Sequence, residues 1–288
     1  MKKKIIVIFI FSLITLFGFS QKSNTDFIKE IKELNQYGKK IISSNDDNEK
    51  QQLNEQYKSL LLQVISNKDA FDYNFDSLTT ISILKANQLK IYNWVLPKTN
   101  GTYEYYAFVT TLVNKEAYKV IELLDKSDKI KQPENKILTP KSWYGALYYK
   151  IIHHKKLGNN YYTVLGWDGN NKLTNKKIID IIQLDTRGNL KLGASIFKMQ
   201  KRTKKRLIFE YAENAVMSVK YHPKFEKIVY DYLVPTGSNL KGVYEYYGPA
   251  LNRFDAIKIA KRKWVYEPDT KIELDRSIKD HMWVDPKK

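Results

Sequence analysis

The stretch 161–171, YYTVLGWDGNN, places oxygen-bearing side chains beside glycine and is the first candidate for chemistry. Asp168 and Asn170 carry oxygen atoms of the kind that bind Ca²⁺. A calcium loop needs further carboxylates at alternate positions, however, and the next one is Asp180. Gly and Asn also tolerate the positive φ angles of tight turns. The spacing therefore favours a connection between two strands over a metal or catalytic loop.

Paired carboxylates are the second kind of chemistry that the sequence allows. A glycoside hydrolase needs two of them about 5–10 Å apart. Such a pair could be assembled from Asp168, Asp180, Glu210 and Asp231. Asp168 and Asp180 are the catalytic candidates, and isoleucines flank Asp180 on both sides. For each of them, a solvated or turn-capping carboxylate is the alternative.

Two clusters of positive charge are candidates for binding an anionic ligand. The run KMQKRTKKR spans residues 198–206, and IAKRKW spans residues 259–264. Clustered cations create a local field for anionic polymers, and aromatic rings add flat contact surface. A solvated loop is the alternative. The predicted ligand-binding residues are Lys201, Arg202, Lys204, Lys205, Arg206 and Trp264.

Several classes of site are excluded or disfavoured by the residues themselves. The chain has no cysteine, which excludes disulfides, cysteine-ligated metals and thiol nucleophiles. Its four histidines form no His-x-x-x-His or His-x-His pair, so no zinc site is predicted. Neither a phosphate-binding loop nor a Gly-x-Ser-x-Gly nucleophile motif occurs. We therefore predict no metal and no cofactor, and whether the protein is an enzyme stays open.

The first twenty residues have the layout of a secretory signal peptide. A basic start, MKKK, precedes the apolar run IIVIFIFSLITLFGF, and the sequence turns polar at Gln21. The apolar run is shorter than the ~20 residues of a spanning helix. We expect cleavage near Ser20–Gln21, with a membrane anchor as the alternative. The mature chain is then exported, periplasmic or secreted, with no transmembrane segment left.

The formal net charge of +18 fits a partner that is negatively charged. For an exported chain we expect acidic envelope polymers or other anionic surfaces rather than cytoplasmic nucleic acid. A lysine-rich composition can also reflect a biased genome. Neither the ligand nor the oligomeric state is predicted.

The elements that must position these residues predict an α+β fold. Helical periodicity predicts a helical hairpin in residues 21–70. Alternating strands predict an antiparallel β-meander in residues 71–266, in two halves, 71–124 and 143–266, joined by the loop 125–142. A charged tail follows from residue 267 to residue 288. A barrel, a sandwich and an open propeller-like arrangement remain alternatives for the β-rich body.

Two local predictions test this interpretation. NKKIIDIIQL, residues 175–184, is predicted to be a strand rather than a helix, because its isoleucines are poor helix formers. A Gly-Pro turn is predicted at 248–249, followed by a last strand that ends near Trp264.

Four stretches of the sequence are the basis for a resemblance to other proteins. They are NQLKIYNWVLPKTNGTYEYYAF, YTVLGWDGNNKLTNKKIIDII, KKRLIFEYAENAVMSVKYHPKFEKIVYDYLVP and VYEYYGPALNRFDAIKIAKRKWVY. Over most of residues 70–265 the chain resembles a family of uncharacterised secreted bacterial proteins. The resemblance implies export and a shared β-rich body, and it implies no activity and no site residue.

Two functions follow as hypotheses. The first is a non-enzymatic envelope or secreted protein that binds through a basic, aromatic-bearing surface. The alternative is a hydrolase of envelope polysaccharide that works through carboxylates such as Asp168 and Asp180.

Overall fold

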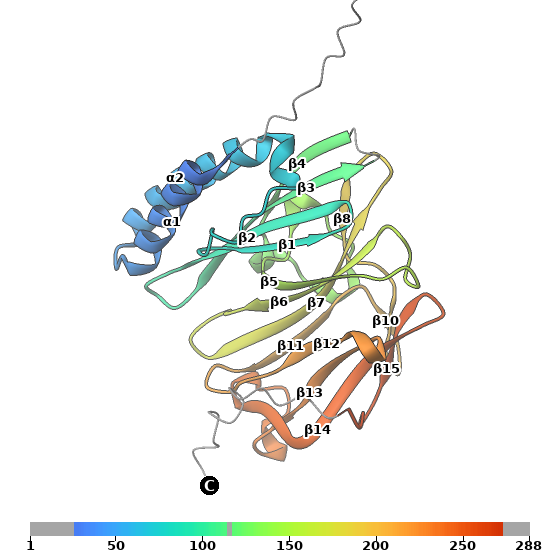
Figure 1. Cartoon of the computed structure of the whole chain (residues 1–288). Coiled ribbons are helices and arrows are strands. Elements are labelled where there is room, and N and C mark those ends of the chain that lie inside the picture. Colours follow the sequence, from blue (N-terminus) through green and yellow to red (C-terminus); the bar gives the residue numbers. More distant parts are fainter. Residues whose placement is uncertain (1–25, 114–116, 273–288) are drawn as a thin grey trace, which may run out of the picture.

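Two α-helices precede three β-sheets in the computed structural model, which describes residues 26–113 and 117–272 (Figure 1). The fold is therefore α+β, as predicted. The predicted signal peptide, residues 1–20, lies outside the described residues, as does most of the predicted tail. No helix within the described ranges is long and apolar enough to cross a membrane.

The two helices form the predicted hairpin, α1 (Ile28–Ser43) and α2 (Asp47–Ser66). The Asp46 carboxylate accepts hydrogen bonds from the backbone N–H groups of Asn48 and Glu49, which caps the start of α2. The inward face is apolar, with Leu34 and Leu61 fully buried. Ile28, the first residue of α1, is exposed.

The first sheet is the simple antiparallel meander that the sequence predicted, in the order β1-β2-β3-β4. Its strands are β1 (Ser82–Ala86), β2 (Leu89–Pro97), β3 (Tyr103–Val113) and β4 (Ala117–Leu124).

The second half of the chain makes two sheets. The second sheet has the order β11-β7-β6-β5, with β8 paired to β7. Its strands are β5 (Leu147–His153), β6 (Tyr161–Asp168), β7 (Thr174–Leu184), β8 (Leu190–Leu192) and β11 (Leu207–Ala212). The strand predicted for residues 175–184 is thus confirmed as part of β7.

The third sheet has the order β10-β9-β15-β14-β13-β12. Its strands are β9 (Phe197–Lys198), β10 (Thr203–Lys204), β12 (Val219–His222), β13 (Lys227–Pro235), β14 (Tyr247–Ala260) and β15 (Lys263–Glu267). The pairing of β15 with β9 is parallel and the other described strand pairings are antiparallel, so the body is predominantly antiparallel, as predicted.

The helices and sheets stack as layers, with a hydrophobic core in each interface (Figure 1). The helices cover one face of the first sheet, the second sheet covers its other face, and the third sheet follows as the last layer. Successive residues of a strand point to opposite faces. In β7, Ile178 and Ile182 therefore enter the core shared with the first sheet, and Ile179 and Ile181 enter the core shared with the third. This double burial explains the consecutive isoleucines on both sides of Asp180.

The first and second sheets are joined at their edges by the buried side chain of Asn93. Its Oδ1 accepts a hydrogen bond from the backbone N–H of Tyr148 at 2.6 Å. Its Nδ2 donates to the carbonyl oxygens of Ser82 and Tyr148, at 2.9 and 3.3 Å. The pairing register of β5 shifts between Tyr148 and Lys150. At Tyr148 the amide of Asn93 makes the hydrogen bonds that the backbone of a neighbouring strand would otherwise make.

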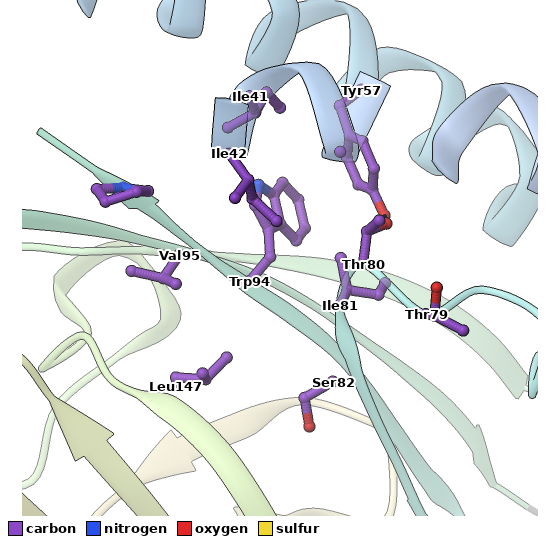
Figure 2. A pocket seen from close by; sticks show the side chains of 12 residues that line it. Ile41, Ile42, Tyr57, Thr79, Thr80, Ile81, Ser82, Trp94, Val95 and Leu147 are labelled. Atoms are coloured by element: carbon purple, nitrogen blue, oxygen red, sulfur yellow. Dashed lines mark hydrogen bonds between the residues drawn. The ribbon is translucent and has the colours of Figure 1, made fainter. Parts of the chain in front are cut away.

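A cavity of about 310 Å³ remains between the helical hairpin and the first sheet (Figure 2). Its walls are mostly apolar, with Ile41 from α1, Tyr57 from α2 and Trp94 from β2. The indole N–H of Trp94 donates to Asn54 at 2.7 Å. The Tyr57 hydroxyl lies 3.5 Å from that of Thr80.

The predicted Gly-Pro turn at 248–249 is absent, because both residues belong to β14 and pair with β13. The tight turn lies instead at Lys261 and Arg262, between Ala260 and Lys263. The φ angles of Lys261 and Arg262 are +49° and +60°, values that residues other than Gly and Asn seldom adopt. β15 then continues past Trp264 to Glu267.

Candidate functional site

Asp168 ends β6, and the residues after it connect β6 to β7, so the predicted strand connection is confirmed. The carboxylate is nearly buried. Its Oδ1 accepts hydrogen bonds from the Tyr105 hydroxyl at 3.1 Å and from the backbone N–H of Asn170 at 2.8 Å. A Cβ on Gly169 would lie 2.3 Å from the ring of Tyr103, so only glycine fits there. Burial raises the pKa of Asp168, and Lys176 opposes that shift.

Asp180 is buried in an ion pair with Arg206, whose Nε donates to Oδ2 at 2.9 Å. Neither side chain is more than 1% exposed. Arg206 also donates to the carbonyl oxygens of Pro133, Lys136 and Leu192, and thereby fixes the loop 125–142 to the second sheet. Burial raises the pKa of Asp180, and the guanidinium acts in the opposite direction. Asp180 therefore has a structural partner rather than a reaction partner.

The two catalytic candidates do not converge. Asp168 is paired in register with Lys176, which precedes Asp180 by four residues along β7. At ~3.3 Å per residue, this places the two aspartates about 13 Å apart along the strand direction. Asp168 also shares a row with Lys176 and Glu210 across three strands, but Lys176 stands between the two carboxylates. Asp168 and Asp180 are therefore not assembled as a catalytic pair.

Of the six residues predicted to bind an anionic ligand, Arg206 and Trp264 are inside the protein. Both are 0% exposed. Trp264 lies in the core between the second and third sheets, and its indole N–H donates to Thr163 at 3.0 Å. Their prediction as surface contacts was wrong, because strand alternation turns Trp264 inward and the ion pair with buried Asp180 holds Arg206 inside.

The other four predicted residues lie at or near the surface, in two different situations. Lys204 is half-buried and forms an ion pair with Glu134 at 2.8 Å, and Lys205 donates to the carbonyl oxygen of Asn135 at 2.6 Å. Lys201 and Arg202 are exposed at the turn between β9 and β10. Of these four residues, Lys201 and Arg202 are the two whose cations make neither an ion pair nor a side-chain hydrogen bond within the described residues.

The strand register of the third sheet reveals a row of lysines that sequence reasoning missed. Lys227 pairs with Lys258, Lys258 with Val265, and Val265 with Lys198. Directly paired residues share a face of a sheet, so the three lysines face the same way. Trp264 and Phe197, the neighbours of Val265 and Lys198, are in the core, so this face points away from that core. We call it the lysine face. Val229 and Ala256 lie on the same face but are buried with Ile272, which covers that part of it.

Neighbouring rows extend the lysine face. By the same alternation it also carries Lys220 of β12 and Lys263 of β15, both exposed. Its carboxylates within the paired parts of these strands are Asp231 and Glu267. Positive charge therefore outnumbers negative charge on this face by five side chains to two.

Glu267 allows Lys227 and Lys258 to stand side by side, although like charges opposite each other destabilise a sheet. One oxygen bonds the ammonium of Lys227, and the other lies 2.8 Å from that of Lys258. Burial acts to raise the pKa of Glu267, but the two lysines outweigh it and hold the pKa at about 2. The carboxylate thus stays ionised at neutral pH.

A cavity of about 400 Å³ lies beside the exposed turn between β9 and β10. It is lined by Phe209, Tyr230, Tyr232 and Tyr266, together with the cations Lys201 and Arg202. We call it the tyrosine pocket. The aromatic surface that the sequence assigned to Trp264 is supplied here by tyrosines.

Metal binding finds no support in the described ranges, where no three histidine, aspartate or glutamate side chains are grouped to hold an ion. No family model, no curated protein and no solved structure matches this chain. The candidate site is therefore argued from its own geometry.

Proposed function

We propose that the protein binds an anionic polymer across the lysine face of the third sheet. The observation that carries this proposal is the register that aligns Lys227, Lys258 and Lys198 in one row. Strands lie ~4.8 Å apart, so the row extends over about 14 Å. A chain with repeated negative charges can contact several of these lysines at once, whereas a small anion contacts one or two.

The position of the face supports this proposal. The third sheet is the last layer of the stack, on the side away from the helices (Figure 1). The expected export, together with the resemblance to secreted proteins, makes acidic polymers of the cell envelope the class of partner that we propose.

The test is binding of the chain to polygalacturonate and to neutral dextran at low and moderate salt. In the row variant, Lys198→Gln, Lys258→Gln and Lys263→Gln are combined. Each exposed ion pair contributes about 0.2–1 kcal/mol, so we expect the affinity for polygalacturonate to fall roughly tenfold. Its salt dependence should weaken as well, because fewer counterions are released.

The matched control removes the same charge elsewhere. Lys29→Gln, Lys32→Gln and Lys39→Gln change three exposed lysines of α1. This helix variant should retain most of the affinity. Equal losses in both variants would mean that net charge alone attracts the polymer, and the lysine face would then have no special role.

The turn at Lys261 and Arg262 provides a prediction in which stability and binding change in opposite directions. A two-residue hairpin turn with positive φ at both positions favours Asn-Gly. Lys261→Asn with Arg262→Gly should therefore raise the free energy of unfolding by about 1–2 kcal/mol, measured by urea denaturation. The affinity for polygalacturonate should fall, because two cations beside Lys263 are lost. A variant that is less stable, or that binds equally well, would contradict this.

A further inference from the structure

The tyrosine pocket lies at the end of the lysine row. Lys198, the last lysine of the row, pairs with Thr203 of β10. The turn between these two residues carries Lys201 and Arg202, which line the pocket. Tyr230 and Tyr266 of the pocket point to the core side of the third sheet, so the turn lies at the sheet edge where the lysine face meets the pocket.

Three kinds of group meet in the pocket. The rings of Phe209, Tyr232 and Tyr266 supply half-buried aromatic surface. Asp255, only 3% exposed, accepts hydrogen bonds from the Tyr266 hydroxyl at 2.5 Å and from the backbone N–H of Asp269 at 3.0 Å. The exposed side holds cations. A largely aromatic wall with a few polar groups is the usual composition of a small-molecule site, and the volume falls in the usual range.

The hydroxyl of Tyr230 is the feature that the fold does not account for. Tyr230 is 4% exposed and lines the pocket, and its ring packs on Phe209 with centroids 4.6 Å apart. Its oxygen has no hydrogen-bond partner in the part of the chain that the structure describes. A buried polar group without a partner destabilises the folded protein, whereas phenylalanine would fill the same space without that cost. Because Tyr230 lines the pocket, a group bound there can supply the missing partner.

We infer that the tyrosine pocket binds a single sugar-acid unit of the polymer. An aromatic wall fits the apolar C–H face of a pyranose, the Tyr230 and Tyr266 hydroxyls and Asp255 suit its hydroxyl groups, and Lys201 and Arg202 suit its carboxylate. Uronic acids are the class of molecule that combines all three features. This inference rests on the proposed function, since it names the unit that the lysine face delivers.

The experiment measures binding of galacturonate, with galactose as the neutral comparison, to the full chain by isothermal titration calorimetry. We expect galacturonate to bind at least fivefold more tightly than galactose, and Arg202→Gln to remove most of that preference. No binding of galacturonate, or equal binding of the two sugars, would overturn the inference.

Tyr230→Phe separates a binding role from a structural one. It should leave the melting temperature unchanged or raise it, and should weaken galacturonate binding at least threefold. Tyr57→Phe is the control, because it removes another buried tyrosine hydroxyl far from the pocket, beneath the helical hairpin. An unchanged affinity in Tyr230→Phe, with the protein folded, would count against the pocket.

The row variant separates this inference from the proposed function. It should weaken polygalacturonate binding but leave galacturonate binding nearly unchanged. If the row variant loses polymer binding and the unaltered chain does not bind galacturonate, the inference about the pocket is rejected and the proposed role of the lysine face is kept. If the unaltered chain binds galacturonate tightly and the row variant keeps its affinity for the polymer, the pocket is supported and the role of the lysine face is not.

Discussion

Replacing Arg206 by methionine is expected to destabilise the protein by about 3–5 kcal/mol, because the change leaves the buried Asp180 carboxylate without its counter-charge. The carbonyl oxygens of Pro133, Lys136 and Leu192 lose a donor at the same time. The measurement is urea denaturation at neutral pH. Lys205→Met is the matched control in the same basic run. It should cost no more than about 1 kcal/mol, because Lys205 gives one hydrogen bond at the surface.

The pH dependence of Arg206→Met gives an independent check. Without the guanidinium, the pKa of Asp180 should rise further above its ordinary value of 3.8, because burial then acts unopposed. A carboxyl whose pKa is higher in the folded than in the unfolded state binds protons on folding. The variant should therefore recover stability as the pH falls through the raised pKa, so its deficit relative to the unaltered chain shrinks in acid.

A double substitution tests whether the two side chains act as a pair. Asp180→Leu with Arg206→Met removes both charges, and apolar replacements of buried ion pairs are often tolerated. The double variant should lose at least about 1 kcal/mol less than the sum of the two single variants. Additive losses, or an Arg206→Met variant within about 1 kcal/mol of the unaltered chain, would contradict the pair.

This buried pair also shows what sequence reasoning can recover. The period of apolar residues predicted the helical hairpin and the α+β class, and the poor helix-forming tendency of isoleucine predicted the strand at 175–184, because each depends on residues close together in the chain. In KMQKRTKKR, by contrast, six cations look alike. Arg206 is distinguished from the rest by its partner, Asp180, which lies 26 residues away in the sequence.

The pairing of distant strands was the larger part of the fold that the sequence did not predict. The parallel contact of β9 with β15 joins segments about 65 residues apart, and two-residue strands leave no periodic signal. Lys220 and Lys258 each stand between two apolar residues, which indicates an outward direction. Which strands are neighbours, and hence that a lysine row exists, depends on pairings that a single sequence does not specify.

The turn at Lys261 and Arg262 was not predicted, and the reason is local. Turn prediction relies on the residues that adopt positive φ without strain. Here two long basic side chains adopt it, whereas the Gly-Pro pair that normally marks a turn lies inside β14. A local rule broken at a position that carries charge is the pattern expected where binding constrains the sequence.

Replacing Asn93 by leucine is expected to destabilise the protein by about 2–4 kcal/mol. The side chain is fully buried, and its amide serves the N–H and carbonyl of Tyr148 and the carbonyl of Ser82. Leucine has nearly the same shape but leaves the buried N–H of Tyr148 without an acceptor. Urea denaturation measures the loss. Ser82→Ala is the control: it removes the hydrogen bond from the Ser82 hydroxyl to the Tyr148 carbonyl, which Asn93 still serves, so the cost should stay below about 1 kcal/mol.

Asn93→Asp distinguishes the hydrogen-bond pattern from simple packing. The carboxylate still accepts from the Tyr148 N–H, but it faces the carbonyl oxygens of Ser82 and Tyr148 without a proton to donate. Protonation supplies that donor and removes the buried charge, so the pKa of the new carboxyl should lie above its unfolded value. Stability should then rise as the pH falls through that pKa and approach that of the unaltered chain. A stability deficit that does not change with pH would mean that shape, rather than the amide's donor and acceptor, joins the first sheet to the second.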